Sequence, residues 1–294
     1  MTDPGVLSGQ AAVDALLKLM DLRQLDEGRY EGMSPPVGPQ RVFGGQVAAQ
    51  ALAAAGRTVD PARIVHSLHA YFVRPGDPAS PITYGVETIR DGRSFSVRRC
   101  TALQHDKPIF LMAASFHRPE SGLDHHGSVP MDVPPPDQTP TMAERLAPYP
   151  ERLSMWSAIS RPIDVRYVGE PGWVRPGDRT PDRTQRVWMR IDGTLPDDPL
   201  IHAIMLTFAS DLTLLDAVLS VHGEVWGPGG MIGASLDHAL WFHRPFRADE
   251  WFLYDCRSPS AAGARGLASG RMFTLDGRNI ATAVQEGLLR RVGG

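Results

Sequence analysis

The chain has few cysteines and no long apolar run. Its two cysteines, Cys100 and Cys256, stand far apart without a C-x-x-C pair, which argues against a disulfide framework and favours a reducing compartment. No apolar segment approaches the ~18 residues that a membrane-spanning helix needs. The first residues, MTDPGVLSGQ, lack the basic and apolar regions of a signal peptide, and the last, RRVGG, are not a peroxisomal signal. We therefore expect a soluble, cytoplasmic protein without a membrane partner.

Strong charge and cofactor motifs are also missing. The net charge is −3, which argues against a nucleic-acid partner. His66 and His69 on one predicted strand, and His238 and His243 on another, point to opposite faces within each pair and cannot share a metal ion. The glycines of 227–233 miss the dinucleotide-binding spacing, and no P-loop occurs. We expect no metal and no cofactor.

The chain does contain one sequence motif twice. Residues 67–76 read SLHAYFVRPG, and residues 235–246 read SLDHALWFHRPF. When Arg74 is aligned with Arg244, the later segment HDKPIFLMAASFHR falls opposite DGRNIATAVQEGLLRR. This correspondence indicates a tandem duplication of one supersecondary unit.

Each copy predicts a helix followed by an antiparallel meander. The first helix, 43–56, opens at Gly44 and is expected to end at Gly56 as its C′ residue; its side chains are so small that another element must pack close to it. A helical run at 197–219 opens the second copy, and a short amphipathic helix is expected at 11–22. Strand-like runs bounded by turn residues lie at 64–73, 81–89, 94–103 and 108–116, then at 162–168, 186–191, 236–243, 251–258, 264–275 and 279–289. The pattern predicts an α+β fold in which a sheet covers a helix.

The two copies are separated by a segment rich in proline. Residues 118–150 carry eight prolines, which is typical of a linker or a surface crossover. We therefore predict an N-terminal unit at 1–120, a linker at 121–155 and a C-terminal unit at 156–294.

Polar residues stand in apolar surroundings at three places of the second copy. Asp211 interrupts a helix that is apolar on nearly all sides, so it is paired or functional, unless Ser210 or Asp211 caps a second short helix. Gln285 is the lone amide on the small-residue face of the last strand, although a solvated strand glutamine is the alternative. Ser235 is expected to begin the strand at 236–243, where backbone contacts could satisfy it. The string GASLD nearly matches a nucleophile elbow, but it has Asp in place of the last Gly and precedes a strand.

A duplicated helix wrapped by an antiparallel sheet resembles the double hotdog fold. The strings VFGGQVAAQAL, VHSLHAYFVRPGDP, SLDHALWFHRPF and ATAVQEG resemble the acyl-CoA thioesterase II family, the TesB type, over nearly the whole chain. The resemblance implies a double hotdog that hydrolyses acyl-CoA to free fatty acid and CoA, and a C-terminal unit that carries the catalytic residues.

The same resemblance implies the site residues. The family's acid, hydroxyl and amide fall on Asp211, Ser235 and Gln285, with serine where the bacterial type has threonine. His66 matches a histidine linked to activity in the family. Together the first three would hold one water, with Asp211 as general base, and backbone N–H groups near a helix start would polarise the thioester oxygen.

The substrate would need an apolar tunnel and cations for the CoA phosphates. Arg175, Arg179, Arg183 and Arg186 are the loop candidates, with solvated loop arginines as the alternative. The sequence leaves a homodimer or a homotetramer open.

Three rival functions remain open. A serine hydrolase would use Ser235 and His238 and form a covalent acyl-enzyme. A hotdog hydratase would need a D-x4-H arrangement that the helix lacks. A non-catalytic acyl-CoA binding protein would keep the tunnel but would not need Asp211.

Overall fold

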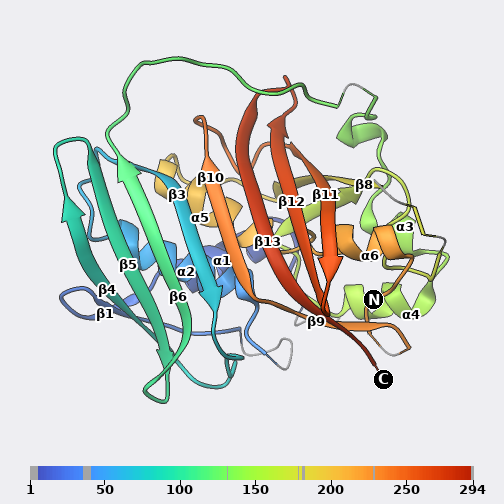
Figure 1. Cartoon of the computed structure of the whole chain (residues 1–294), viewed down its shortest axis with the longest axis horizontal. Helices are drawn as coiled ribbons and strands as arrows, with labels where there is room; N and C mark the ends of the chain where they lie inside the picture. Colours follow the sequence, from blue (N-terminus) through green and yellow to red (C-terminus); the bar gives the residue numbers. More distant parts are fainter. Residues whose placement is uncertain are drawn as a thin grey trace.

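The two copies of the repeated sequence motif form adjacent strands at the centre of one antiparallel sheet (Figure 1). The computed structural model describes residues 6–35, 41–130, 132–177, 179–180, 183–227 and 229–292. Its helices are α1 (Gly9–Met20), α2 (Gly44–Gly56), the 3₁₀ helix η1 (Pro136–Gln138), α3 (Met142–Leu146), α4 (Pro150–Ser157), α5 (Pro199–Ser210) and α6 (Asp216–His222). Its strands are β1 (Arg23–Asp26), β2 (Arg29–Gly32), β3 (Ile64–Phe72), β4 (Ile82–Asp91), β5 (Phe95–Gln104), β6 (Lys107–His117), β7 (Ile163–Tyr167), β8 (Thr184–Ile191), β9 (Met231–Ser235), β10 (Asp237–Phe242), β11 (Phe252–Ala262), β12 (Arg265–Thr274) and β13 (Asn279–Arg291).

The strand order shows the duplication directly. Over the described residues the sheet has 13 strands, in the order β1-β2-β4-β5-β6-β3-β10-β13-β12-β11-β8-β7, with β9 beside β13. The centre is the antiparallel pair of β3 and β10, in which Leu68 lies opposite Leu240. On either side the same order repeats outward, β6-β5-β4 from β3 and β13-β12-β11 from β10. The predicted double hotdog is confirmed.

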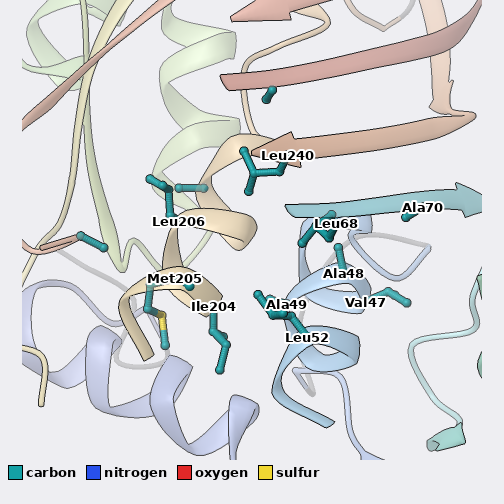
Figure 2. Packing of buried hydrophobic residues seen from close by; sticks show 14 of the residues in the cluster. Val47, Ala48, Ala49, Leu52, Leu68, Ala70, Ile204, Met205, Leu206 and Leu240 are labelled. Atoms are coloured by element: carbon teal, nitrogen blue, oxygen red, sulfur yellow. The ribbon is translucent and has the colours of Figure 1, made fainter. Parts of the chain in front are cut away.

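The central helices α2 and α5 lie together behind the sheet (Figure 1). We call the face of the sheet that they cover the inner face, and the opposite one the outer face. Figure 2 shows the packing where both helices meet the two central strands; its labelled residues are Val47, Ala48, Ala49, Leu52, Leu68, Ala70, Ile204, Met205, Leu206 and Leu240. All of them are buried, and each leucine buried in this way stabilises the fold by about 1.5–3 kcal/mol. Helix α5 is therefore the element that packs closely against the small side chains of α2.

Two details of the helix predictions are wrong. Residues 197–219 do not form one helix, because α5 ends at Ser210 and α6 begins only at Asp216. The Ser210 hydroxyl bonds the carbonyl of Thr207 at 2.9 Å, and this local bond competes with continuation of the helix. Gly56 is the last helical residue rather than a left-handed C′ residue, since Arg57 after it keeps a right-handed helical conformation. What Gly56 provides is room, because a β-carbon there would lie 2.6 Å from Leu200 Cδ2.

The predicted linker is attached to the second unit and contains short helices. Figure 1 shows it leaving β6 and crossing the molecule to reach α3. The indole N–H of Trp188 donates to the carbonyl of Pro134 at 2.8 Å, and Arg186 contacts Asp132 at 3.2 Å. Helix α3 starts with a complete capping box at Thr141, a signal that the sequence does contain as T-x-x-E. The division at 121–155 stays a prediction, because the sheet itself continues across both units.

No helix of the described chain is both long enough and apolar enough to span a membrane.

Candidate active site

Asp211 lies where the end of α5 meets the start of α2. It is the C-cap residue of α5, so its side chain leaves the helix at the point where the helical hydrogen bonds stop. A β-carbon added to Gly44 would lie 2.6 Å from Asp211 Oδ2, and one added to Gly45 would lie 2.6 Å from the carbonyl oxygen of Phe208. Because neither position has room for a side chain, the glycine pair allows the first turn of α2 to touch the carboxylate.

The alternative that Asp211 caps a second helix is wrong. Helix α6 begins five residues later, and its N-cap residue is Leu215. The Asp211 carboxylate instead accepts hydrogen bonds from side chains of the sheet.

Gln285 reaches Asp211 from the last strand of the sheet. Along β13 the burial alternates as predicted, with Ala281, Ala283 and Gln285 fully buried on the inner face. The amide nitrogen of Gln285 donates to Asp211 Oδ1 at 2.5 Å and to Ser235 Oγ at 2.7 Å. Both amide hydrogens therefore have partners, and they join the helix end to a second strand.

Ser235 completes the cluster from a different place in the strand pattern than predicted. It does not begin the strand at 236–243; it ends β9, opposite Gly287 of β13. The following strand β10 starts at Asp237, whose carboxylate accepts the backbone N–H of Glu286 at 2.6 Å. This contact breaks the strand after Ser235. The Ser235 hydroxyl donates to Asp211 Oδ1 at 3.2 Å.

The cluster combines a buried amide with an acid and a hydroxyl from two partly exposed residues. Gln285 has no exposed surface, whereas Asp211 and Ser235 are partly exposed. Burial raises the pKa of the Asp211 carboxyl above its ordinary value of 3.8, and hydrogen bonds from the amide, the hydroxyl and the backbone N–H of Gly45 oppose this shift. A carboxylate of raised pKa is a stronger base than an exposed aspartate, so the arrangement suits proton transfer from a water molecule.

A serine nucleophile with a histidine base is not assembled here. The imidazole Nε2 of His238 contacts Ser210 Oγ at 2.8 Å, inside the protein. The hydroxyl of Ser235 is bonded to the acid and the amide instead. No imidazole of the described residues hydrogen bonds to Ser235.

His66 lies away from the cluster, on the outer face of the sheet. Its Nε2 contacts Ser115 Oγ at 2.8 Å, and its ring packs edge-on against Phe95 and His117. Register shifts between Val65 and Ser67, which is why His66 departs from simple alternation. The structure does not bring His66 together with the three residues on the inner face.

The four predicted arginines have different surroundings. Arg175 pairs with Glu170 at 3.0 Å, and Arg186 pairs with the buried Asp255 at 3.1 Å. Arg179 is exposed and Arg183 is half-buried in the loop before β8. Over the part of the chain that the structure describes, no three His, Cys, Asp or Glu side chains gather at metal-binding distances.

Sequence reasoning missed the place of Gly44 beside Asp211, and it named His238 only as a residue of the rival serine hydrolase. The signal for Gly44 was the FGG string at the start of an alanine-rich helix. His238 follows an aspartate that fixes the strand break, and its imidazole lies beside the buried amide of Gln285.

The sheet order and the two central helices make the chain a double-hotdog protein, and comparisons with known proteins show which family of this fold it belongs to. The family model for the acyl-CoA thioesterase N-terminal domain matches residues 32–117, and the model for acyl-CoA thioesterase matches residues 160–288. The chain belongs to the acyl-CoA thioesterase family of thioester hydrolases, the TesB type.

Individual relatives agree over nearly the full length. The chain is 40% identical over 280 residues to acyl-CoA thioesterase 2 of Haemophilus influenzae, covering 94% of this chain and 96% of that protein. It is 39% identical to acyl-coenzyme A thioesterase 8 of Homo sapiens, covering 92% of this chain and 88% of that protein. Among solved structures, an acyl-CoA thioesterase II, TesB2 of Mycobacterium marinum, has a TM-score of 0.77 at 40% identity and covers 95% of this chain and 98% of that one.

Proposed function

We propose that this protein hydrolyses fatty acyl-CoA to free fatty acid and CoA by direct attack of a water held by Asp211, Ser235 and Gln285. The observation that carries this proposal is the Gln285 amide, which bonds the acid of one helix and the hydroxyl of one strand at the same time. With both hydrogens engaged, the amide fixes the acid and the hydroxyl relative to each other, and these two partly exposed residues offer their remaining acceptor positions to the water.

The chemistry needs a base and an orienting pair. Asp211 takes a proton from the water as the water oxygen attacks the thioester carbonyl carbon, and the carbonyl electrons move to the oxygen. When this intermediate collapses, the carbon–sulfur bond breaks, and the CoA thiolate leaves and takes up the proton that Asp211 accepted, which returns the carboxylate to its ionised form. General-base help of this kind contributes about 10²–10⁴-fold.

The developing oxyanion has a candidate donor nearby. Helix α2 starts against Asp211; the N–H of Gly45 bonds the Asp211 carboxylate and those of Gln46 and Val47 bond the Phe43 carbonyl, which leaves the N–H of Gly44. Such N–H groups, backed by the helix dipole, stabilise negative charge. Because Gly44 and Gly45 have no side chains, no side chain of their own covers this helix start.

For the CoA phosphates, Arg179 and Arg183 remain the better candidates, because Arg175 and Arg186 are already held in ion pairs.

The first experiment replaces the base. Thiol release from acyl-CoA of short to long chain length is measured for the wild type, for Asp211→Asn and for the control Asp216→Asn. Asp216 is a second buried carboxylate nearby in sequence, bonded to Tyr167 and Trp226 and outside the cluster. We expect kcat to fall about 10²-fold or more in Asp211→Asn only. A folded Asp211→Asn protein with wild-type turnover would refute the assignment.

The second experiment separates the water mechanism from a covalent one. If Ser235 only orients, Ser235→Thr stays active and Ser235→Ala loses about 10- to 10³-fold while keeping measurable turnover. Intact-mass spectrometry of enzyme quenched during turnover should show no acyl adduct. An adduct on Ser235 would establish the serine hydrolase instead, and a protein that binds acyl-CoA without releasing thiol would establish the non-catalytic function.

A further inference from the structure

Two buried polar atoms beside the cluster have no hydrogen-bond partner. They are Nδ1 of His238 and Oε1 of Gln285. Leaving a buried donor or acceptor unpaired costs about 1–3 kcal/mol, so two such atoms in one place call for an explanation.

The register of the sheet places these two side chains next to each other. In the pair of β10 with β13, Ala239 lies opposite Val284, so the next residue on each strand brings His238 opposite Gln285. Both side chains point to the inner face and are fully or almost fully buried. Directly opposed residues have β-carbons about 4.5–5.5 Å apart, within reach of one hydrogen bond between these side chains.

The protonation state of the His238 imidazole and the contacts of its two nitrogens favour a hydrogen on Nδ1. Burial lowers the pKa of the His238 imidazole below its ordinary 6.5, so the ring is neutral at neutral pH and carries one N–H. Its Nε2 lies 2.8 Å from Ser210 Oγ, whose single hydrogen can bond either Nε2 or the carbonyl of Thr207. If the proton sat on Nε2, His238 Nδ1 and Gln285 Oε1 would be two buried acceptors without a donor. With the proton on Nδ1 both atoms gain a partner, and the Ser210 hydroxyl donates to Nε2.

We infer that His238 is a positioning residue that donates its Nδ1–H to Gln285 Oε1 and so holds the amide with its nitrogen toward Asp211 and Ser235. This inference rests on the proposed function of that cluster. His238 does not touch the substrate; it acts through Gln285.

The donor matters because an amide has two nearly equivalent orientations. If the carbonyl oxygen has no partner, rotation of the amide by half a turn places that oxygen against the Asp211 carboxylate and removes both donated hydrogen bonds. Asp211 selects the amide nitrogen from one side, and His238 selects the carbonyl oxygen from the other. Both contacts are needed to fix one orientation.

Two conservative variants divide the functions of the imidazole. In His238→Asn the amide nitrogen takes roughly the place of Nδ1 and keeps a donor toward Gln285, but loses the reach to Ser210. In His238→Gln the amide takes roughly the place of Nε2 and keeps the contact with Ser210, but loses the donor toward Gln285. Thiol release, kcat, KM and thermal unfolding are measured for both, alone and combined with Gln285→Ala.

The expected result is a large kcat loss in His238→Gln, about 10- to 100-fold with KM unchanged, and near wild-type kcat in His238→Asn. In the Gln285→Ala background His238→Gln should have little further effect. Equal rates for both variants, the reverse order, or additive losses would overturn the inference. A wild type that releases no thiol would instead refute the proposed function.

A spectroscopic measurement covers the case in which a variant does not fold. The ¹⁵N spectrum of histidine-labelled wild type reports the tautomer of each neutral ring. The His238 signal is identified as the one that is missing from a His238 variant that folds. If neither variant folds, it is identified as the signal that shifts in Ser210→Ala. We expect the proton on Nδ1, and loss of that preference in Gln285→Ala. A proton on Nε2 in the wild type would overturn the inference.

Discussion

Replacing Gly44 by alanine tests whether the close contact of α2 and α5 positions the base. The added β-carbon would lie 2.6 Å from Asp211 Oδ2 and 2.9 Å from Phe72 Cε1, whereas ordinary contact begins at 3.4 Å. The carboxylate oxygen must therefore move by about 0.8 Å. Gly44 does not have a positive φ, so alanine fits the backbone, and the change would otherwise stabilise the helix by about 0.4–1 kcal/mol.

A displacement of this size should lower the catalytic rate strongly but change the stability of the fold little. The other carboxylate oxygen is held by Ser235 and Gln285 at 3.2 and 2.5 Å, so the carboxylate cannot move without disturbing these bonds. A misplacement near 1 Å can reduce a rate by about 10²-fold. We expect Gly44→Ala to lower kcat by about 10- to 100-fold while the midpoint of thermal unfolding stays within a few degrees of the wild type.

The assay is thiol release under saturating acyl-CoA, with two controls. Gly85→Ala adds the same methyl group on β4, where the nearest atom would be 4.0 Å away, and should leave kcat unchanged. The double variant Gly44→Ala with Phe72→Leu removes the ring contact but not the contact with Asp211. Full activity of folded Gly44→Ala would refute the argument, and recovery in the double variant would assign the loss to the ring.

Three further predictions follow from the same contacts. Asp211 must be ionised to act, and burial raises its pKa, so kcat/KM should fall on acidification with an apparent pKa above 3.8; a midpoint at or below that value would contradict the assignment. Burial raises the pKa of Asp216 from 3.8 to about 6, so its protonated form favours the folded state. Its stabilising contribution is complete only well below pH 4 and is lost as the pH rises through about 6. The free energy of unfolding of the wild type, measured with denaturant, should therefore fall by about 2 kcal/mol between pH 4 and 7 relative to Asp216→Asn, and parallel pH profiles would contradict this. Residues 1–120 expressed alone should be inactive and insoluble, because β3 would expose the edge that pairs with β10; a soluble, active fragment would contradict this.

The duplication and the polar outliers were predictable because both are patterns of side-chain type. Alternation along β13 separates the small inner face from the other, and it places the amide of Gln285 beside Ala281 and Ala283. Asp211 was conspicuous because a carboxylate inside an apolar helix needs partners. Such signals depend on composition within one element.

The parts that were not predictable depend on contacts between elements. The break between β9 and β10 follows from one bond of Asp237 to the backbone of β13, which no local pattern encodes. Likewise, the register shift beside His66 turns that side chain to the outer face, and a one-residue slip of this kind changes every face assignment around it. The role of Gly44 appears only when α5 is placed against α2.

The duplication also explains why the chain has one cluster rather than two. The pair of β5 with β6 sets Arg98 opposite Ala114, at the positions that Ala268 and Gln285 take in the pair of β12 with β13. The residue after α2 is Arg57, where Asp211 follows α5. In the first unit the amide and the acid are thus replaced by an alanine and an arginine. The space is not left open, because the buried guanidinium of Arg98 fills it and bonds Thr58 Oγ1 at 2.9 Å and Asp91 at 2.9 Å. The first unit has kept the fold and the central strand, and has exchanged the polar cluster for a structural ion pair.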